Sequence, residues 1–285
     1  MRGECHITVS SAALCQRCPA LMAYAVLRGE KNAWKVGIKG KGYYYGSLFH
    51  REIAKVFFDG ACNPEAPLHV KISRALSGGR QEIESVIREN IFIPFLAAKS
   101  ESCTSGQIIA MAEGIAVWVR AMSEFFALIP SLARSPEESM HTVFMKPEQK
   151  LEAVYKNGGI KMNVVGCYDA LLFNPDRCEA RLFEFKGYVK SDIAVPLSQS
   201  LIYSWLVWKN TGIIPSVEII YLGSDESEIF TPSSVRDMII AGLPGLFASA
   251  FSVIARRRLP DFMRDERLCA ECPFRTKCDD DWRRL

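Results

Sequence analysis

The alternation of apolar and polar positions predicts several β-strands in the second half of the chain. Between residues 149 and 187, extended apolar runs are separated by an Asn-Gly-Gly turn at 157–159 and an Asn-Pro-Asp turn at 174–176. Residues of these types reverse the chain tightly. We therefore expect a three-stranded meander over 149–187. The run SVEIIYL predicts a further strand over 216–222.

Apolar residues recur with helical spacing on both sides of this meander. The spacing predicts helices over 10–28 (opened by Ser10 or Ser11), 47–58, 80–133 with a break near 100–105, and 196–209. Residues 59–79 are expected to form a loop. Strands interspersed with helices predict an α/β protein with a central mixed sheet flanked by helices. We expect residues 1–285 to form a single domain, with residues 80–145 as a helical insertion before the central strands.

The stretch LFEFKGY, residues 182–188, carries charges inside an apolar strand. Side chains alternate between the two faces of a strand, so Phe183 and Phe185 should point one way and Glu184 and Lys186 the other. Burying a carboxylate and an ammonium costs desolvation energy. We expect another group to offset that cost. The plainer alternative is an edge strand with a solvent-facing Glu–Lys pair.

Asp169 supplies a second carboxylate close to this strand. It lies in the run VVGCYDALLF, which precedes LFEFKGY, and neighbouring strands would bring Asp169 and Glu184 near enough to share one divalent cation. Two carboxylates with waters and phosphate oxygens suit Mg²⁺ or Mn²⁺. Lys186 could then position or deprotonate an attacking water and stabilise the phosphate charge. Gln199 and Tyr203 are four residues apart in the next predicted helix and share a face.

These residues occur in the order G-x-x-x-H, G-x-x-D, E-x-K and Q-x-x-x-Y, at 46–50, 166–169, 184–186 and 199–203. With this order the chain resembles the RecB-type branch of the PD-(D/E)XK nucleases. The resemblance implies a restriction-endonuclease-like fold and metal-dependent cleavage of DNA. It implies that the metal ligands are His50, Asp169, Glu184 and the backbone carbonyl of Phe185. It also implies that Lys186 is the catalytic lysine, and that Gln199 and Tyr203 orient the site. A lone histidine such as His50 is more often structural.

Ten cysteines are many for a chain of 285 residues. Because the N-terminus shows no secretory signal peptide, metal ligation is a better explanation than a disulfide framework. Cys269, Cys272 and Cys278 cluster near the C-terminus, and Cys15 and Cys18 lie near the N-terminus. Four thiolates are the common ligand set of a 4Fe–4S cluster. Two alternatives stay open: a zinc site formed by the two Cys-x2-Cys pairs, and reduced structural thiols.

The CRISPR-associated iron–sulfur exonucleases, the fourth core Cas protein, have a similar layout of cysteines. The resemblance favours Cys18, which precedes Pro19, as the partner of the C-terminal three. It implies a 4Fe–4S cluster held by Cys18, Cys269, Cys272 and Cys278 that joins residues 259–285 to residues 10–28. It further implies an exonuclease acting on single-stranded or overhanging DNA in spacer acquisition, with an integrase or helicase as a protein partner.

Charge and hydropathy change this picture little. The net charge of +3 does not by itself establish a nucleic-acid partner. The uncharged run 238–255 approaches the length of a membrane span. Glycines and a proline interrupt it, so we expect a buried helix–turn–helix, and a soluble cytoplasmic protein with no membrane partner. Two other functions remain open: a non-catalytic DNA-binding or scaffold subunit, and a defence endonuclease acting with a helicase or integrase.

Overall fold

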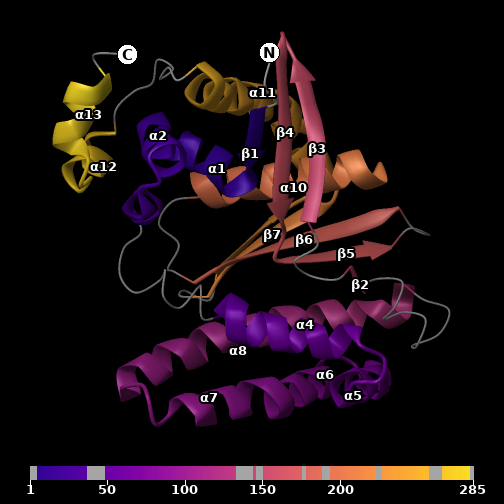
Figure 1. Cartoon of the computed structure of the whole chain (residues 1–285). Helices are drawn as coiled ribbons and strands as arrows, with labels where there is room; N and C mark the ends of the chain where they lie inside the picture. The colour runs from indigo at the N-terminus through magenta and orange to yellow at the C-terminus, as the bar shows by residue number, and fades with distance from the viewer. Residues whose placement is uncertain are drawn as a thin grey trace.

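The protein is a mixed α/β structure with two small mixed sheets and many helices (Figure 1). The computed structural model describes residues 5–36, 49–132, 144–145, 150–174, 178–187, 193–222, 226–256 and 265–282. The α/β class predicted from the sequence is confirmed. The prediction of a single central sheet is wrong, because the strands divide between two sheets.

The first sheet has three strands in the order β1-β4-β3. Strand β4 (Ile160–Cys167) is parallel to β1 (Cys5–Thr8) and antiparallel to β3 (Lys150–Asn157). Strands β3 and β4 form the hairpin that the Asn-Gly-Gly turn predicted, with Gly158 and Gly159 both at positive φ. Glycine adopts this backbone conformation without steric cost, so the turn is tight.

The second sheet has five strands in the order β2-β5-β6-β7-β8. Strand β6 is antiparallel to β5 and parallel to β7, and helix α10 crosses over between β6 and β7. A parallel pair requires such a crossover. The elements are β2 (Phe144–Met145), β5 (Ala170–Asn174), β6 (Glu179–Lys186), β7 (Ser216–Tyr221), β8 (Glu226–Phe230) and α10 (Ala194–Thr211).

The run VVGCYDALLF breaks at Tyr168 and Asp169, where the chain passes from the first sheet to the second. The predicted three-stranded meander is therefore wrong, and so is the expectation that Asp169 lies within a strand. Tyr168 is 1% exposed, and Leu171 and Val164 on either side of the break are also buried. Because burial continues through the break, the apolar pattern alone did not reveal it.

The two faces of β6 pack on different cores. Leu182 belongs to a cluster with residues of α10, whereas Phe183 and Phe185 belong to a cluster with residues of the long helix α8 (Ser105–Leu132). The predicted alternation along LFEFKGY is therefore confirmed. Sheet β2-β5-β6-β7-β8 lies between α10 on one side and, on the other, α8 and the helices next to it, which are drawn below the sheet in Figure 1.

Helix α8 approaches the sheet closely at the end of β7. A Cβ added to Gly114 would lie 2.5 Å from the carbonyl oxygen of Leu222, so only glycine fits there. The Leu222 N–H in turn donates to the carbonyl oxygen of Lys186 at 2.8 Å. Glycine at 114 therefore lets the insertion pack directly against the backbone that follows β7, which is itself hydrogen-bonded to the end of β6.

The helical insertion begins earlier in the chain than expected. Residues 59–79 are mostly helical and not a loop, because α4 runs to Cys62 and α5 covers Pro67–Ala75. Helix α5 begins at Pro67, and proline is favourable at the first position of a helix. The break predicted near 100–105 falls between α7 and α8. The helices of this region are η2 (Phe49–Ala54), α4 (Lys55–Cys62), α5 (Pro67–Ala75), η3 (Leu76–Gly78), α6 (Arg80–Ile87), η4 (Arg88–Phe92), α7 (Ile93–Lys99) and α8.

The N-terminal helix predicted over 10–28 is two helices. Thr8 caps α1 (Val9–Arg17) by accepting a hydrogen bond from the Ser11 N–H, so the predicted cap at Ser10 or Ser11 is wrong. The helix stops at Cys18, whose backbone is extended (φ −164°, ψ 118°), and α2 (Pro19–Leu27) follows. A residue before proline is biased away from the helical conformation, which explains the break. The short helix η1 (Lys31–Lys35) follows α2.

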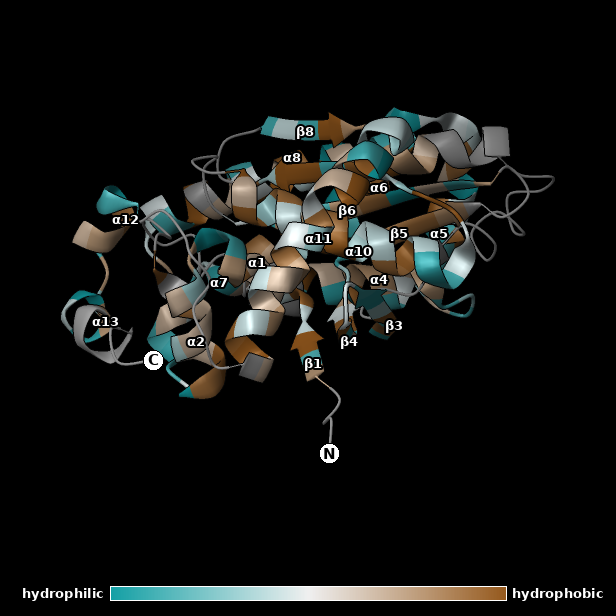
Figure 2. Ribbon diagram, turned by 90° about the horizontal axis from the view of Figure 1, so that it is seen from above, coloured by the Kyte–Doolittle hydropathy of each residue, from teal (hydrophilic) through white to brown (hydrophobic). Residues whose placement is uncertain are grey.

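Helix α11 (Pro232–Arg256) is continuous, so the predicted helix–turn–helix is wrong. Val235, Ile239, Leu243 and Phe247 are buried at helical spacing on both sides of Pro244, and this packing holds one helix. Within the described residues it is the one helix long and apolar enough to cross a membrane, and 33% of its most apolar window is buried. Figure 2 shows its mixed hydropathy. Core helices share this length and composition.

Two short helices, α12 (Glu266–Ala270) and α13 (Arg275–Trp282), form the C-terminal segment. Phe274 between them is 6% exposed and stacks on Tyr24 of α2 with ring centroids 4.6 Å apart. Figure 1 shows the two yellow helices beside α2. Residues from the two ends of the chain thus pack together through an aromatic pair.

Candidate active site

The centre of the site is a buried ion pair on β6. Glu184 is 4% exposed, and the Lys186 Nζ donates to its Oε1 at 2.5 Å. The two residues are separated by one position on the strand and therefore share a face. This is the face that packs toward α10, because the intervening Phe185 belongs to the opposite core. The solvent-facing alternative is excluded.

Helix α10 supplies the second acceptor of the lysine. The Lys186 Nζ donates to Gln199 Oε1 at 2.6 Å. The Lys186 side chain is only 13% exposed, so its ammonium exchanges most of its hydration for these two oxygens. Gln199 fixes the lysine in one position relative to Glu184. The structure therefore brings Glu184, Lys186 and Gln199 into direct contact.

Asp169 is tied to the same strand through the backbone. Its Oδ2 accepts a hydrogen bond from the Phe185 N–H at 2.9 Å. The chain break at Asp169 therefore places a carboxylate directly beside the peptide that links Glu184 to Lys186. A hydrogen bond to a carboxylate is charge-assisted and stronger than a neutral one. This bond fixes Asp169 at the end of β6.

Tyr203 lies one helical turn from Gln199 and is 7% exposed. Its pKa is raised well above the ordinary value, first because burial disfavours the phenolate, and then because of the negative charges of Glu184, Asp169 and Cys167. The phenol therefore stays neutral. A neutral phenol can donate a hydrogen bond, whereas a phenolate cannot.

Gly166 makes room for this tyrosine. A Cβ at position 166 would lie 2.3 Å from Val9 Cγ2 and 2.7 Å from Tyr203 Cε1. Any larger residue would displace the tyrosine ring or the start of α1. The sequence singled out Gly166 only as the first position of G-x-x-D, and its packing role was missed. A glycine three residues before an acidic residue was the available signal.

The residues present fit a divalent cation in part. Asp169, Glu184 and the Phe185 backbone lie together, and Mg²⁺ binds through one or two carboxylates while keeping several waters. His50 lies in η2, and its side chain is outside the described residues. Within the described part of the chain, no three His, Cys, Asp or Glu side chains converge closely enough to hold a metal ion.

The four cysteines singled out by the sequence line one cavity of about 570 Å³ between α2 and the C-terminal helices. Tyr24, Phe274 and Leu268 line the same cavity. Burial raises the pKa of Cys18, and the charges of Cys269 and Cys272 raise it further. The thiols therefore face a common space, but among the described residues they do not converge into a ligand cluster.

Cys15 does not line this cavity. It is 3% exposed within the core of α1, and burial raises its pKa to about 12, with a smaller contribution from Cys18. A thiol in such surroundings behaves as a small apolar side chain. The zinc pattern, which pairs Cys15 with Cys18, would therefore include a thiol that lies outside this cavity.

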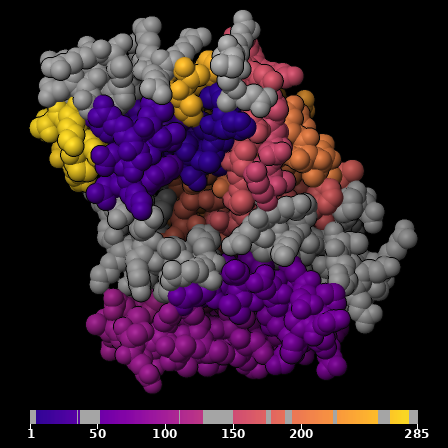
Figure 3. Space-filling model, in the orientation of Figure 1, coloured from indigo at the N-terminus to yellow at the C-terminus, as the bar shows by residue number. Residues whose placement is uncertain are grey.

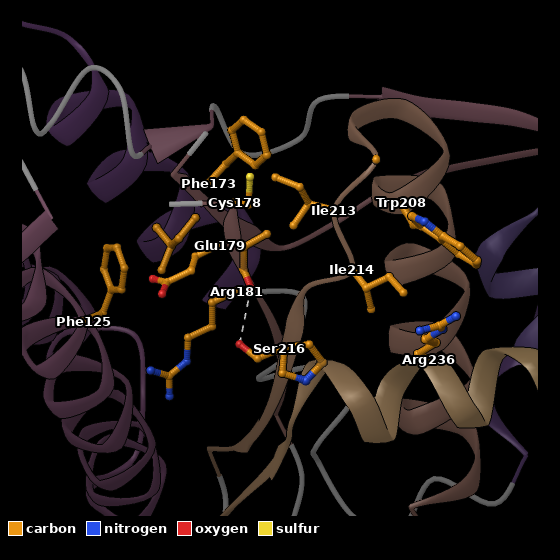
Figure 4. A pocket seen from close by; sticks show the side chains of 14 residues that line it. Phe125, Phe173, Cys178, Glu179, Arg181, Trp208, Ile213, Ile214, Ser216 and Arg236 are labelled. Atoms are coloured by element: carbon orange, nitrogen blue, oxygen red, sulfur yellow. Dashed lines mark hydrogen bonds between the residues drawn. The ribbon is translucent and has the colours of Figure 1, made fainter. Parts of the chain in front are cut away.

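A second cavity, of about 780 Å³, lies at the opposite end of β6. Figure 4 shows Phe173, Trp208 and Ile213 around it, with Arg181 and Arg236 at its sides. Arg181 is ion-paired with Glu218, which is 7% exposed. Arg181 is the residue of β6 lining this cavity that is nearest to the site, and it lies three strand residues, or about 10 Å, from Glu184, so the cavity lies beside the candidate active site and does not include Glu184 or Lys186.

Comparisons with known proteins give weak likenesses to solved structures and no family. No protein-family model matches the sequence, and no curated protein matches it. A solved structure described as "Crystal structure of SSO0001" is similar over 98% of this chain and 88% of that chain, with 13% sequence identity and a TM-score of 0.40.

The raised pKa of Tyr203 predicts a pH dependence of stability. Above pH about 10 the unfolded chain releases the phenol proton, whereas the folded chain keeps it. The contribution is complete below pH 10 and is lost as the pH rises toward the folded pKa, at about 1.4 kcal/mol per pH unit. We expect Tyr203→Phe to reduce the decline in unfolding free energy between pH 10 and 11, measured by urea denaturation. Equal declines for both proteins would show that the Tyr203 phenol is not buried.

Proposed function

We propose that the protein is a metal-dependent DNA nuclease that hydrolyses phosphodiester bonds. The observation that carries the proposal is the Lys186 ammonium, held on Glu184 and Gln199 beside the Asp169 carboxylate. A positioned ammonium next to two carboxylates is suited to stabilising charge on a phosphate during displacement. The RecB-type motif order supports the same class of activity.

Each side chain has a distinct role in this proposal. Asp169, Glu184 and the Phe185 carbonyl would hold Mg²⁺ or Mn²⁺, with His50 as a further ligand. The bound ion would supply a nucleophilic water at neutral pH and neutralise phosphate charge. Lys186 would orient the attacking water and stabilise the developing negative charge. Gln199 keeps Lys186 in position, and the neutral Tyr203 phenol is available as a hydrogen-bond donor to the substrate backbone.

The energetics of burial favour function over mere stability. Replacing a buried ion pair with apolar residues is often neutral or stabilising, so such a pair is weak support for stability as its purpose. Glu184 and Lys186 lie in a strand whose neighbouring positions, Phe183 and Phe185, are 1% exposed. A chain selected only for stability could place apolar residues at 184 and 186 as well.

We further propose that Cys18, Cys269, Cys272 and Cys278 ligate a 4Fe–4S cluster. Their location around one cavity between α2 and the C-terminal helices supports it, and so does the exclusion of Cys15 from that cavity. The cluster's role would be structural: its ligands would hold residues 259–285 against residues 10–28. The corresponding biological setting is DNA trimming in CRISPR spacer acquisition or related defence, with an integrase or helicase partner.

Cleavage of end-labelled DNA tests the nuclease proposal. Wild-type protein, Lys186→Ala and the control Lys209→Ala are incubated with linear single-stranded, duplex and circular DNA in Mn²⁺. Lys209 is an exposed residue of α10 about 15 Å along the helix from Gln199. We expect wild type and control to degrade linear single strands, and Lys186→Ala to be slower by about a hundredfold or more, as when one stabilising donor is removed.

The same experiment separates the alternatives. Cleavage of circular DNA at the rate of linear DNA would favour a defence endonuclease over an end-dependent exonuclease. DNA binding without cleavage by any of the three proteins would favour a non-catalytic binding subunit. Equal cleavage by wild type and Lys186→Ala would contradict the role assigned to the lysine.

Metal analysis tests the cysteine site. Protein purified without oxygen should contain iron and sulfide and should absorb visible light. Cys18→Ser should lose the iron, the sulfide and the absorbance. Cys15→Ser is the matched control, because Cys15 is three residues away but outside the cavity, and it should keep all three. Zinc in place of iron, or loss of metal in Cys15→Ser but not in Cys18→Ser, would contradict the assigned ligands.

A further inference from the structure

The cavity of about 780 Å³ beside the start of β6 is walled mainly by apolar side chains. Phe173, Trp208, Ile213 and Ile214 line it, and each packs against the core while remaining only partly buried. Ligand pockets in proteins typically measure about 300–1,000 Å³ and have an apolar lining with a few polar groups. An apolar molecule that filled this cavity would remove those four side chains from water, which is favourable.

The end of α10 forms one wall of the cavity. Gly212, at φ 77°, ends the helix, and its N–H donates to the Trp208 carbonyl at 2.8 Å. Glycine adopts this left-handed conformation without steric cost, so the chain turns there and brings Ile213 and Ile214 to the same cavity as Trp208. The Asn210 side chain donates to a backbone carbonyl of β3 at 3.2 Å. Figure 3 shows orange surface, from the part of the chain that includes α10, beside the pink of β3.

The second wall carries a fixed ion pair. Arg181 is paired with Glu218, and its guanidinium lies 5.2 Å from the centroid of the Phe183 ring. These contacts hold the guanidinium in place and offset its charge. Glu179 also lines the cavity and precedes Arg181 by two residues on the same face of β6. This wall therefore contains charges of both signs close together.

Arg236 provides a cation on the other side of the cavity. It is exposed in the second turn of α11, and within the part of the chain that the structure describes it has neither an ion pair nor a hydrogen bond from its side chain. Figure 4 shows Arg236 on the same side as Trp208, with Ile213 and Ile214 between them and Glu179 and Arg181. A guanidinium binds carboxylate, sulfonate and phosphate groups through paired hydrogen bonds.

We propose that this cavity binds an amphipathic organic anion. A flat or branched apolar body would lie against Trp208, Ile213 and Ile214, and one carboxylate, sulfonate or phosphate group would bind to Arg236. An anion is favoured over a cation because the one carboxylate among the described lining residues, Glu179, shares its strand face with a guanidinium. The proposal does not depend on the nuclease function, since the cavity includes neither Glu184 nor Lys186.

Two fluorescent probes that differ in one charged group test this site. Anilinonaphthalene sulfonate is an aromatic anion, and phenylnaphthylamine has the same aromatic body without the sulfonate. Both are titrated into wild type, Arg236→Gln and the matched control Arg74→Gln, which changes an exposed arginine of α5 that lines neither cavity described above. Arg236→Gln should bind the sulfonate about fivefold or more weakly, because it loses a charge-assisted contact. Its affinity for phenylnaphthylamine should be unchanged, and the control should match wild type for both probes.

Two further variants locate the probe within the cavity. Ile213→Trp places a larger side chain in the cavity and should weaken the binding of both probes. Glu179→Gln removes a negative charge and should bind the sulfonate at least as tightly as wild type. Thermal melting of each variant without probe shows whether it is folded. If Ile213→Trp does not fold, the comparison of the two probes on Arg236→Gln still decides the proposal.

Each alternative outcome contradicts a defined part of the proposal. Equal affinity of wild type and Arg236→Gln for the sulfonate would overturn the assignment of Arg236. Equal weakening of both probes in Arg236→Gln would overturn the anion, because the residue would then act without reference to charge. Undiminished binding of both probes by folded Ile213→Trp would place them elsewhere, and no binding of the sulfonate by wild type would overturn the site altogether. None of these results bears on cleavage of DNA.

Discussion

The buried ion pair of Glu184 and Lys186 is the constraint around which the candidate site is organised. A carboxylate that is 4% exposed needs a charged or hydrogen-bonding partner, and Lys186 supplies it at 2.5 Å. The ammonium in turn needs a further acceptor, which is Gln199 of α10. The strand and the crossover helix are thus bound together by polar contacts inside an otherwise apolar interface. This explains why the site lies between β6 and α10.

The neighbouring elements reach the pair through close backbone approaches. Asp169 accepts from the Phe185 N–H, which holds the junction of the two sheets against β6. Gly166 permits the contact of that junction with Tyr203, and Gly114 permits the contact of α8 with Leu222, whose N–H bonds to the Lys186 carbonyl. Two glycines therefore determine how closely the first sheet and the helical insertion approach β6.

Local rules predicted much of this from the sequence. The period of two along LFEFKGY gave the two faces of β6, and the four-residue spacing of Gln199 and Tyr203 gave the shared face of α10. Pro19 contained the signal for the helix break at Cys18 that was missed. The division into two sheets was not predictable in this way, because the chain remains buried through Tyr168 and only long-range contacts reveal the break. The continuation of helix α11 through Pro244 was not predictable either, because it depends on the packing of buried residues on both sides of the proline.

The most direct test of the central claim is the thermal stability of Lys186→Met with and without Mn²⁺. Removing one partner of a buried pair costs about 3–5 kcal/mol, so the variant should melt well below wild type in EDTA. Mn²⁺ should restore much of the loss, because the ion would neutralise Glu184 in place of the ammonium, and Glu184→Gln/Lys186→Met should melt higher than Lys186→Met in EDTA. A Lys186→Met protein that melts like wild type in EDTA, or that Mn²⁺ leaves unchanged, would contradict the claim that Glu184 is a buried charge shared between Lys186 and a divalent cation.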